Sequence, residues 1–357
     1  MKIALLQGRN VVSSTWGSEK VLCQLSSGLA ERGHTVSALC ADGIDGLPFY
    51  PLSDKVDFIN LRGSNRNKWS AWWNLRAHLA RFQPDIIICF YIRDFLSAAL
   101  AWPQARCVLM LHCEPNFYLV KMSSFKRWLF RALHARLKVI QVLLPSYKQS
   151  ALALHDHVVV IPNGTVLVPP VDPNLREKVI LSVGRFDRNQ KQQHILIAAF
   201  LRLADDFPDW RLELWGSLAD HSYVDECKAL VSHAECKDRI VFAGTTSDLS
   251  KVYQRAAFMA LPSRYEGFPL VLLEAYAHGL PILGLDSCEA VSQLVLHDKS
   301  GLLCENDVAA LEASLRKLMQ NEALRQELSQ GALEQAELYN LDHIIDQWER
   351  LIVSVNS

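Results

Sequence analysis

Residues 263–283 read SRYEGFPLVLLEAYAHGLPIL and combine a polar loop, a predicted helix and the start of a buried strand. Glu266 falls in the loop, and Glu274 lies about two turns into the helix, at ~3.6 residues per turn. Gly267 and Pro269 bracket a tight turn at the helix start, where backbone N–H groups lack intrahelical acceptors and attract phosphate. The segment therefore predicts a diphosphate at the helix start, with both carboxylates accepting hydrogen bonds from sugar hydroxyls, which describes a sugar-nucleotide site. The alternative is a surface Glu followed by a Glu packed between elements.

This segment is one part of a strand–helix alternation along the chain. The predicted strands are continuous apolar runs, which are typical of a parallel sheet buried on both faces. They lie at 2–7, 34–40, 56–61, 85–90, 106–112, 140–144, 157–161, 178–184, 211–216, 239–244, 258–262 and 281–286. Helices are predicted near 18–32, 68–82, 93–101, 121–137, 146–154, 191–205, 222–235, 248–256 and 269–278. We therefore expect a doubly wound α/β fold.

A proline-rich stretch divides the alternation in two. Residues 162–177, PNGTVLVPPVDPNLRE, contain four Pro and no clear periodicity. We predict one Rossmann-like domain over 1–164 and a second over 178–338, facing each other across a cleft. The last segment, 339–357, is predicted to be a helix that crosses back to the first domain. Its apolar face comprises Ile344, Ile345, Trp348, Leu351 and Ile352.

Length and composition narrow the class of protein. At 357 residues, half of them hydrophobic, the chain can bury two cores. No apolar run reaches the ~20 residues of a membrane-spanning helix, and the apolar run at the N-terminus is too short for a signal peptide. The nine Cys never pair as C-x-x-C, which predicts reduced, mostly buried thiols in a cytoplasmic protein. No metal-site spacing occurs in the sequence.

Because ligands of open α/β sheets bind at the carboxyl ends of strands, residues just after strands are candidates for chemistry. Arg185 directly follows the strand 178–184, and Lys191 begins the next helix; both suit phosphate oxygens. His112 ends the strand 106–112 and suits a sugar hydroxyl. Gly17 precedes a helix and permits a close backbone approach. The alternatives are two solvated surface cations and a packed or capping His.

Four stretches, in this order, resemble the retaining glycosyltransferases of family four, which have the GT-B fold. They are SVGRFDRNQKQQHILIAAF, LELWGS, IVFAGTTSDLSKVYQRAAFMALPSRYEGFPLVLLEAYAHGLPIL and HDKSGLLCE, within roughly residues 178–305. The first half is similar more loosely, through the Gly17 loop, His112 and PNG at 162–164. The resemblance implies two Rossmann-like domains and transfer of a sugar from a nucleotide sugar.

The resemblance also implies a role for each candidate residue. Arg185 and Lys191 would hold the donor diphosphate, and Glu274 the nucleotide ribose. Glu266 would position the transferred sugar, and His112 would act near that sugar and the acceptor. Backbone contacts to the donor would come from Gly17, Gly216, Gly267, Phe268 and Pro269.

Retaining transfer in this family is thought to be a front-face reaction in which the leaving phosphate takes the acceptor proton. The resemblance therefore implies no protein nucleophile, no metal and no cofactor beyond the nucleotide sugar, which we expect to be UDP-linked. The sequence also lacks a D-x-D triplet. Several positions depart from the family pattern, which usually has glycine there: Trp16, Gln192, Leu218 and the loop around Cys288. These departures leave the identity of the donor open.

The charge is uneven along the chain. Residues 1–165 hold 19 Lys and Arg against 10 Asp and Glu, and residues 166–357 hold 18 against 28. The excess lies in 62–82 and 121–138, where Lys and Arg accompany Trp, as expected of a surface on anionic lipid. Phe125, Trp128, Leu129, Ala132 and Leu133 follow helical spacing, so we expect them to pack inward and the cations to face outward. A merely soluble basic face is the alternative, and no nucleic-acid motif accompanies the charge.

We therefore expect a cytoplasmic glycosyltransferase, peripheral on the inner face of the cell membrane. Its acceptor would be a glycan or lipid-linked molecule in cell-envelope polysaccharide or glycolipid assembly. One alternative is a sugar-nucleotide epimerase or a phosphorylase on a related fold. The other is a non-catalytic sugar-nucleotide-binding membrane adaptor. The sequence leaves open the sugar, the linkage and the oligomeric state.

Overall fold

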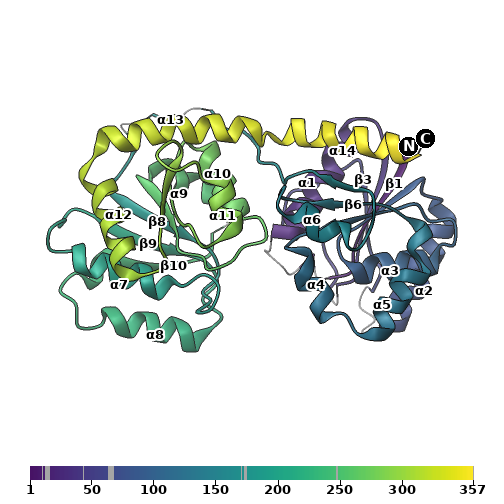
Figure 1. The fold of residues 1–357 in the computed structure, drawn as a ribbon, viewed down its shortest axis with the longest axis horizontal. Coiled ribbons are helices and arrows are strands. Elements are labelled where there is room, and N and C mark those ends of the chain that lie inside the picture. The colour runs from purple at the N-terminus through teal and green to yellow at the C-terminus, as the bar shows by residue number, and fades with distance from the viewer. Residues whose placement is uncertain are drawn as a thin grey trace. The chain divides into compact units, whose positions relative to one another are not determined.

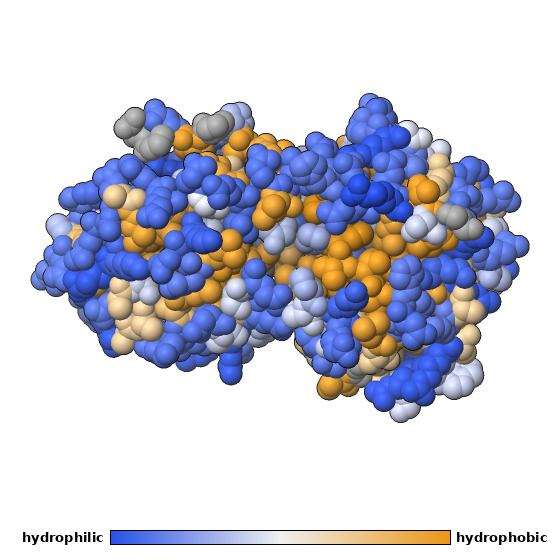
Figure 2. Space-filling model, turned by 45° about the horizontal axis from the view of Figure 1, so that its top comes forward, coloured by the Kyte–Doolittle hydropathy of each residue, from blue (hydrophilic) through white to orange (hydrophobic). Residues whose placement is uncertain are grey.

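A computed structural model describes residues 1–9, 11–12, 17–42, 44–62, 68–169, 171–172, 175–246 and 248–356. The chain divides into two compact units (Figure 1). Unit 1 comprises Met1–Asn163 and Leu341–Ser357, and unit 2 comprises Gly164–Asn340. The surface seen in Figure 2 is mostly hydrophilic, with hydrophobic patches on both units.

Unit 1 is built on a seven-stranded parallel sheet of order β3-β2-β1-β4-β5-β6-β7. Its strands are β1 (Lys2–Gln7), β2 (Thr35–Cys40), β3 (Val56–Asn60), β4 (Ile86–Cys89), β5 (Cys107–Leu111), β6 (Leu137–Val142) and β7 (Val158–Val160). Its helices are α1 (Gly17–Glu31), α2 (Lys68–Phe82), α3 (Ile92–Ala101), α4 (Pro115–Lys121), α5 (Ser124–Ala132), the 3₁₀ turn η1 (His134–Arg136), α6 (Tyr147–Leu152) and α14 (Leu341–Asn356).

Unit 2 is built on a six-stranded parallel sheet of order β10-β9-β8-β11-β12-β13. Its strands are β8 (Val179–Val183), β9 (Arg211–Trp215), β10 (Ile240–Gly244), β11 (Phe258–Leu261), β12 (Ile282–Leu285) and β13 (Gly301–Cys304). Its helices are α7 (Gln193–Leu203), α8 (His221–Val231), the 3₁₀ turn η3 (Lys237–Arg239), α9 (Leu249–Arg255), α10 (Leu270–Ala277), α11 (Glu289–Leu294), α12 (Val308–Gln320) and α13 (Glu322–Leu338).

The two sheets share one topology, and this topology marks where ligands bind. Every residue of β4, β5, β8, β11 and β12 is buried, as the continuous apolar runs predicted. In each unit the strand order reverses after its first strand, between β1 and β4 and between β8 and β11. A Rossmann-like sheet binds its ligand at this switch point, beyond the carboxyl ends of the strands. The predicted pair of doubly wound, Rossmann-like parallel α/β sheets is therefore confirmed.

The predictions missed some elements. The strand β13 was not predicted, because its four residues, GLLC, carry no separate period-two signal. The single helix predicted over 121–137 is wrong: α5 covers only Ser124–Ala132, with α4 before it and η1 after it.

The predicted inward face of this helix is wrong for three of its five residues, whereas Leu133, just after α5, is buried as predicted and Leu129 is half-buried. Phe125 and Trp128 are 67 % and 62 % exposed, and Ala132 is exposed as well. The only buried side chain of α5 is Phe130, whose ring lies 5.4 Å from that of Phe95. One aromatic anchor off the predicted stripe therefore sets the helix rotation.

Helix α14 packs on α1 within unit 1. Its five predicted apolar residues are all buried. A Cβ at Gly28 of α1 would lie 2.7 Å from Ile345, so glycine permits the close approach. Arg32, which directly follows α1, pairs with Asp346 at 2.7 Å. Within the described ranges, no helix is both long and apolar enough to cross a membrane. Eight of the nine Cys are buried, and Cys113 is half-buried.

Candidate active site

Lys191 and Glu266 meet at the carboxyl edge of the unit 2 sheet. Lys191 lies near the end of the loop between β8 and α7, and Glu266 lies in the loop between β11 and α10. Lys191 Nζ lies 2.5 Å from Glu266 Oε1, and the two side chains are only 14 % and 8 % exposed. The structure therefore joins two residues that are 75 positions apart in a mostly buried ion pair at the switch point. The alternative of a solvated surface cation is wrong for Lys191.

Arg185 lies on the open side of the same loop. Its Nη2 donates to Gln190 Oε1 at 2.7 Å and lies 3.2 Å from Asp187 Oδ2. The side chain is 46 % exposed, so its planar guanidinium group is accessible to an anion. Its contacts with Gln190 and Asp187 hold it in place. The two predicted cations thus have different environments, one mostly buried and paired, one held at the surface.

A buried glutamine that the sequence analysis did not single out holds this loop. Gln193, the first residue of α7, is 3 % exposed, and its Nε2 donates to the Arg185 carbonyl at 2.9 Å. Its Oε1 accepts from the Asp187 N–H at 3.4 Å. From the other side, the Arg264 N–H donates to the Gln190 carbonyl at 2.7 Å, which ties the loop to the segment that carries Glu266. The loop is therefore fixed from both flanks before any ligand binds.

Glycine at 216 has a packing reason in this structure. A Cβ there would lie 1.9 Å from the carbonyl oxygen of Gly184, at the end of the neighbouring strand. The Gly184 N–H donates to the Trp215 carbonyl at 2.8 Å, and the Gly216 N–H to the Gly244 carbonyl at 2.7 Å. Gly216 therefore allows the ends of β8 and β9 to lie close together. Its predicted contact with the nucleotide stays a prediction.

The segment Gly267–Phe268–Pro269 leads into α10. Phe268 is buried and meets Tyr339 edge to face, with ring centroids 6.0 Å apart. Pro269 is the N-cap residue, without a side-chain cap, and the Leu272 N–H donates to its carbonyl at 3.1 Å, which leaves the N–H groups of Leu270 and Val271 for an anion. The packing of Phe268 therefore fixes the position of the N-terminus of α10.

Glu274 lies four residues after the first residue of α10, so little more than one turn into the helix and not two as predicted. Its Oε2 accepts from Tyr253 Oη at 2.9 Å. Tyr253 is buried, and Arg176 donates to its carbonyl at 2.8 Å. Arg176 Nη2 donates to the carbonyl of His278, at the end of α10, at 2.5 Å. Arg176 thereby joins α9 to α10. Glu274 is thus packed between elements, as the alternative stated, and its carboxylate has a fixed position.

His112 directly follows β5, at the carboxyl edge of the unit 1 sheet. Its ring centroid lies 5.3 Å from that of Phe90 and 5.4 Å from that of Tyr91. Burial, followed by the positive charge of Arg9, lowers the pKa of His112 to about 4, against a hydrogen bond to the Phe90 backbone. The imidazole is therefore neutral near pH 7. Its buried Nε2 has no hydrogen-bond partner among the described residues, so it can accept from a hydroxyl.

Gly17 is the first residue of α1 and is exposed, while Trp16 lies outside the described residues. The next two side chains connect α1 to the neighbouring strands. Tyr91 Oη donates to Ser18 Oγ at 3.0 Å, and Gln7 Nε2 donates to the buried Glu19 at 2.8 Å. The Gly17 helix start is therefore held against the switch point of unit 1, between β1 and β4.

Cys288, in a loop that departs from the family pattern, lies against the ion pair. It is fully buried, and burial raises the pKa of its thiol to about 11, with the charge of Glu266 adding to this and that of Lys191 opposing it. Sequence reasoning found neither this contact nor Tyr253 and Arg176. Their partners are distant in sequence, so no local spacing could signal them.

No group of three or more His, Cys, Asp or Glu that could hold a metal ion occurs within the described part of the chain.

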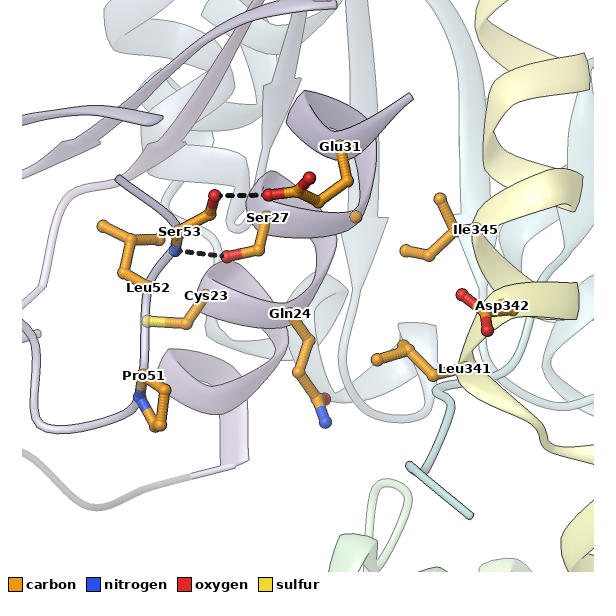
Figure 3. A pocket seen from close by; sticks show the side chains of 11 residues that line it. Cys23, Gln24, Ser27, Glu31, Pro51, Leu52, Ser53, Leu341, Asp342 and Ile345 are labelled. Atoms are coloured by element: carbon orange, nitrogen blue, oxygen red, sulfur yellow. Dashed lines mark hydrogen bonds between the residues drawn. The ribbon is translucent and has the colours of Figure 1, made fainter. Parts of the chain in front are cut away.

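A pocket of about 450 Å³ lies in unit 1, beside α1 and the start of α14 (Figure 3). Ser53 lines it and is already bonded to two other lining residues, Ser27 at 2.9 Å and Glu31 at 2.7 Å. None of the predicted site residues lines this pocket.

Comparison with known proteins assigns the chain to a family. Residues 168–335 match the model of glycosyl transferases group 1, and residues 16–168 match that of glycosyltransferase family 4. The chain belongs to glycosyltransferase family 4, and it is a glycosyltransferase. The recognition made from the sequence motifs is therefore confirmed.

Three similar proteins illustrate the relationship. The chain is 26 % identical to an uncharacterized glycosyltransferase of Haemophilus influenzae, over 96 % of this chain and 97 % of that one. It is 23 % identical to the amylovoran biosynthesis glycosyltransferase AmsD of Erwinia amylovora, over 96 % and 97 %. The solved structure of Anabaena HepE in complex with UDP and glucose is 16 % identical, with a TM-score of 0.78 over 99 % of this chain and all of the other. This last likeness shows the fold.

Proposed function

We propose that this glycosyltransferase moves a hexose from a UDP-sugar to a glycan or lipid-linked acceptor in cell-envelope polysaccharide or glycolipid assembly, with retention and without a metal. The observation that carries the proposal is the Lys191–Glu266 pair beside Arg185, at the switch point of unit 2. The UDP-bound neighbour and the polysaccharide relative support the donor and the acceptor class.

The donor diphosphate would lie between Arg185 and the start of α10. A Lys ammonium has three N–H donors, so Lys191 can keep its bond to Glu266 and still donate to a phosphate oxygen. Glu274, held by Tyr253, would accept from the ribose hydroxyls. Glu266 and the backbone of Gly267, Phe268 and Pro269 would position the sugar. No cofactor besides the nucleotide sugar is proposed.

Transfer would proceed on one face of the sugar. The bond from the anomeric carbon to the β-phosphate oxygen breaks while the bond to the acceptor oxygen forms, and the departing phosphate takes the acceptor proton. Negative charge on the diphosphate grows along this path. Arg185, Lys191 and the α10 dipole would therefore bind the transition state more tightly than the ground state, which is what accelerates the reaction. The neutral Nε2 of His112 would accept from a hydroxyl of the sugar or of the acceptor.

Release of UDP from a panel of UDP-sugars, with and without a lipid-linked acceptor, tests the proposal. We expect acceptor-dependent release from at least one donor, and an α-linked product from an α-linked donor. Lys191→Met should abolish UDP release. The proposal fails if no donor releases UDP, if the product has the inverted configuration, or if the donor is epimerised or cleaved by phosphate instead. Release at the wild-type rate in Lys191→Met would refute the site.

A further inference from the structure

Helix α5 of unit 1 presents aromatic side chains to solvent. Phe125 and Trp128, one turn apart, are 67 % and 62 % exposed, and their rings stack with centroids 6.0 Å apart. Only Phe130 of the nine residues of α5 is buried. Burial of a Phe or Leu side chain typically stabilises by ~1.5–3 kcal/mol, so folding of unit 1 leaves this gain unused. A stacked, exposed aromatic pair on one helix marks an interaction surface.

Basic side chains flank these two rings. Lys126, Arg127 and Arg131 belong to the same helix and are all exposed. Between Glu114 and Asp156 the chain has seven Lys and Arg and no Asp or Glu. We call Phe125, Lys126, Arg127, Trp128 and Arg131 the α5 patch. A partner that neutralises this patch must be anionic, and it must also accept two aromatic rings.

The preceding helix adds apolar surface of the same kind. Phe117 and Val120 of α4 are 50 % and 84 % exposed. Between α4 and α5, Met122 is buried and anchors the connection, and the Ser123 hydroxyl caps α5 by accepting from the Lys126 N–H at 3.4 Å. The exposed rings therefore sit on a capped, anchored helix and not on a loose segment.

We propose that the α5 patch docks unit 1 on an anionic lipid bilayer, with Phe125 and Trp128 inserted at the headgroup level and the cations on the phosphates. Trp and Phe prefer this interface, and each nearby Lys or Arg strengthens attachment to anionic lipid. This arrangement reverses the sequence-based expectation, in which the rings pointed inward. Only the reason for docking, a lipid-linked acceptor, rests on the proposed function.

Vesicle co-sedimentation of the full chain tests the docking. The vesicles are phosphatidylcholine alone and an equimolar mixture of phosphatidylcholine and phosphatidylglycerol. Wild type should partition preferentially onto the mixed vesicles. The triple variant Lys126→Gln, Arg127→Gln, Arg131→Gln should lose about 100-fold in partitioning, from three cations at the surface. A matched variant that removes three exposed cations of unit 2, Lys228→Gln, Lys237→Gln and Lys251→Gln, should bind like wild type.

The aromatic insertion is tested separately. Phe125→Ser with Trp128→Ser should lose at least ~10-fold in partitioning, whereas Leu338→Ser, at another exposed apolar residue, should not. Brominated phosphatidylglycerol should quench wild-type fluorescence more than that of Trp128→Phe. Equal binding to both vesicle types, equal loss in the control variants, or equal quenching overturns the proposal.

These assays contain no sugar donor, so they do not depend on turnover. Vesicle binding without UDP release from any donor would refute the proposed function and leave the docking standing. UDP release by a chain that does not bind anionic vesicles would refute the docking and leave the proposed function standing.

Discussion

The Lys191–Glu266 pair is expected to stabilise unit 2 as well as bind the donor, and a double-mutant cycle separates the two roles. The variants are Lys191→Met, Glu266→Gln and both together. Each single change leaves one charge mostly buried without its partner. With side chains 14 % and 8 % exposed and a 2.5 Å contact, each should cost about 3 kcal/mol, the lower end for a buried pair.

The double variant removes both charges, and replacing a buried pair by groups of similar size is often close to neutral. We therefore expect its free energy of unfolding to lie within about 1 kcal/mol of wild type, which with two single losses of about 3 kcal/mol each means a coupling of about 5 kcal/mol. Lys178→Met is the matched control. Lys178 pairs with Asp209 at 3.1 Å, but with side chains 56 % and 73 % exposed, so its loss should cost under ~1 kcal/mol.

Urea unfolding followed by circular dichroism gives the stabilities, and calorimetric titration with UDP gives the affinities. All three variants of the cycle should bind UDP weakly, including the double variant that recovers stability. Coupling below ~0.5 kcal/mol would refute the structural role. Wild-type UDP affinity in the double variant would refute the binding role.

Three further changes test other parts of the account. Gln192→Gly should stabilise the protein by about 0.5–1 kcal/mol and raise its melting temperature, because Gln192 holds a left-handed φ of 52° and its buried Oε1 has no hydrogen-bond partner among the described residues. Gln83→Gly, at φ 53°, should act likewise in unit 1, and a loss of stability in both variants would contradict this. Tyr253→Phe should weaken UDP binding several-fold by releasing Glu274, and unchanged calorimetric affinity would contradict it. His112→Asn and Asp94→Asn should shift the pH dependence of unfolding in opposite directions. The pKa of half-buried His112 is lowered to about 4, so wild type loses stability as pH falls below the ordinary His pKa of ~6.5. The pKa of buried Asp94 is raised to about 6, so wild type gains stability as pH falls through 6. Relative to wild type, urea unfolding at about pH 5 should therefore show a gain of ~2 kcal/mol for His112→Asn and a loss of ~1 kcal/mol for Asp94→Asn; equal shifts of one sign would contradict both assignments.

The sequence predicted the parallel sheets because buried strands read as continuous apolar runs, which is a local signal. It also predicted that Arg185 and Lys191 follow a strand and that Glu266 precedes a helix. It could not predict that Lys191 and Glu266 pair, because that contact depends on the adjacency of β8 and β11 in the sheet. The family pattern usually has glycine after Lys191. The backbone of Gln192 is left-handed, a conformation that glycine adopts without steric cost, and this is the physical reason for the pattern.

The error at α5 has a different cause. Helical spacing of Phe125, Trp128, Leu129, Ala132 and Leu133 correctly indicated an apolar stripe, but periodicity does not say which face meets the core. The rotation is set by Phe130 against Phe95, a long-range contact. In the sequence, a stripe that is mostly exposed, with only Leu133 of the five residues buried, has the same spacing as one that is fully buried.

A crystal structure of the complex with UDP tests the central claim most directly. The account predicts the diphosphate within hydrogen-bonding distance of Lys191 Nζ and the Arg185 guanidinium, with the ribose hydroxyls on the Glu274 carboxylate. A diphosphate bound elsewhere in unit 2, with the Lys191–Glu266 pair untouched by it, would contradict the account.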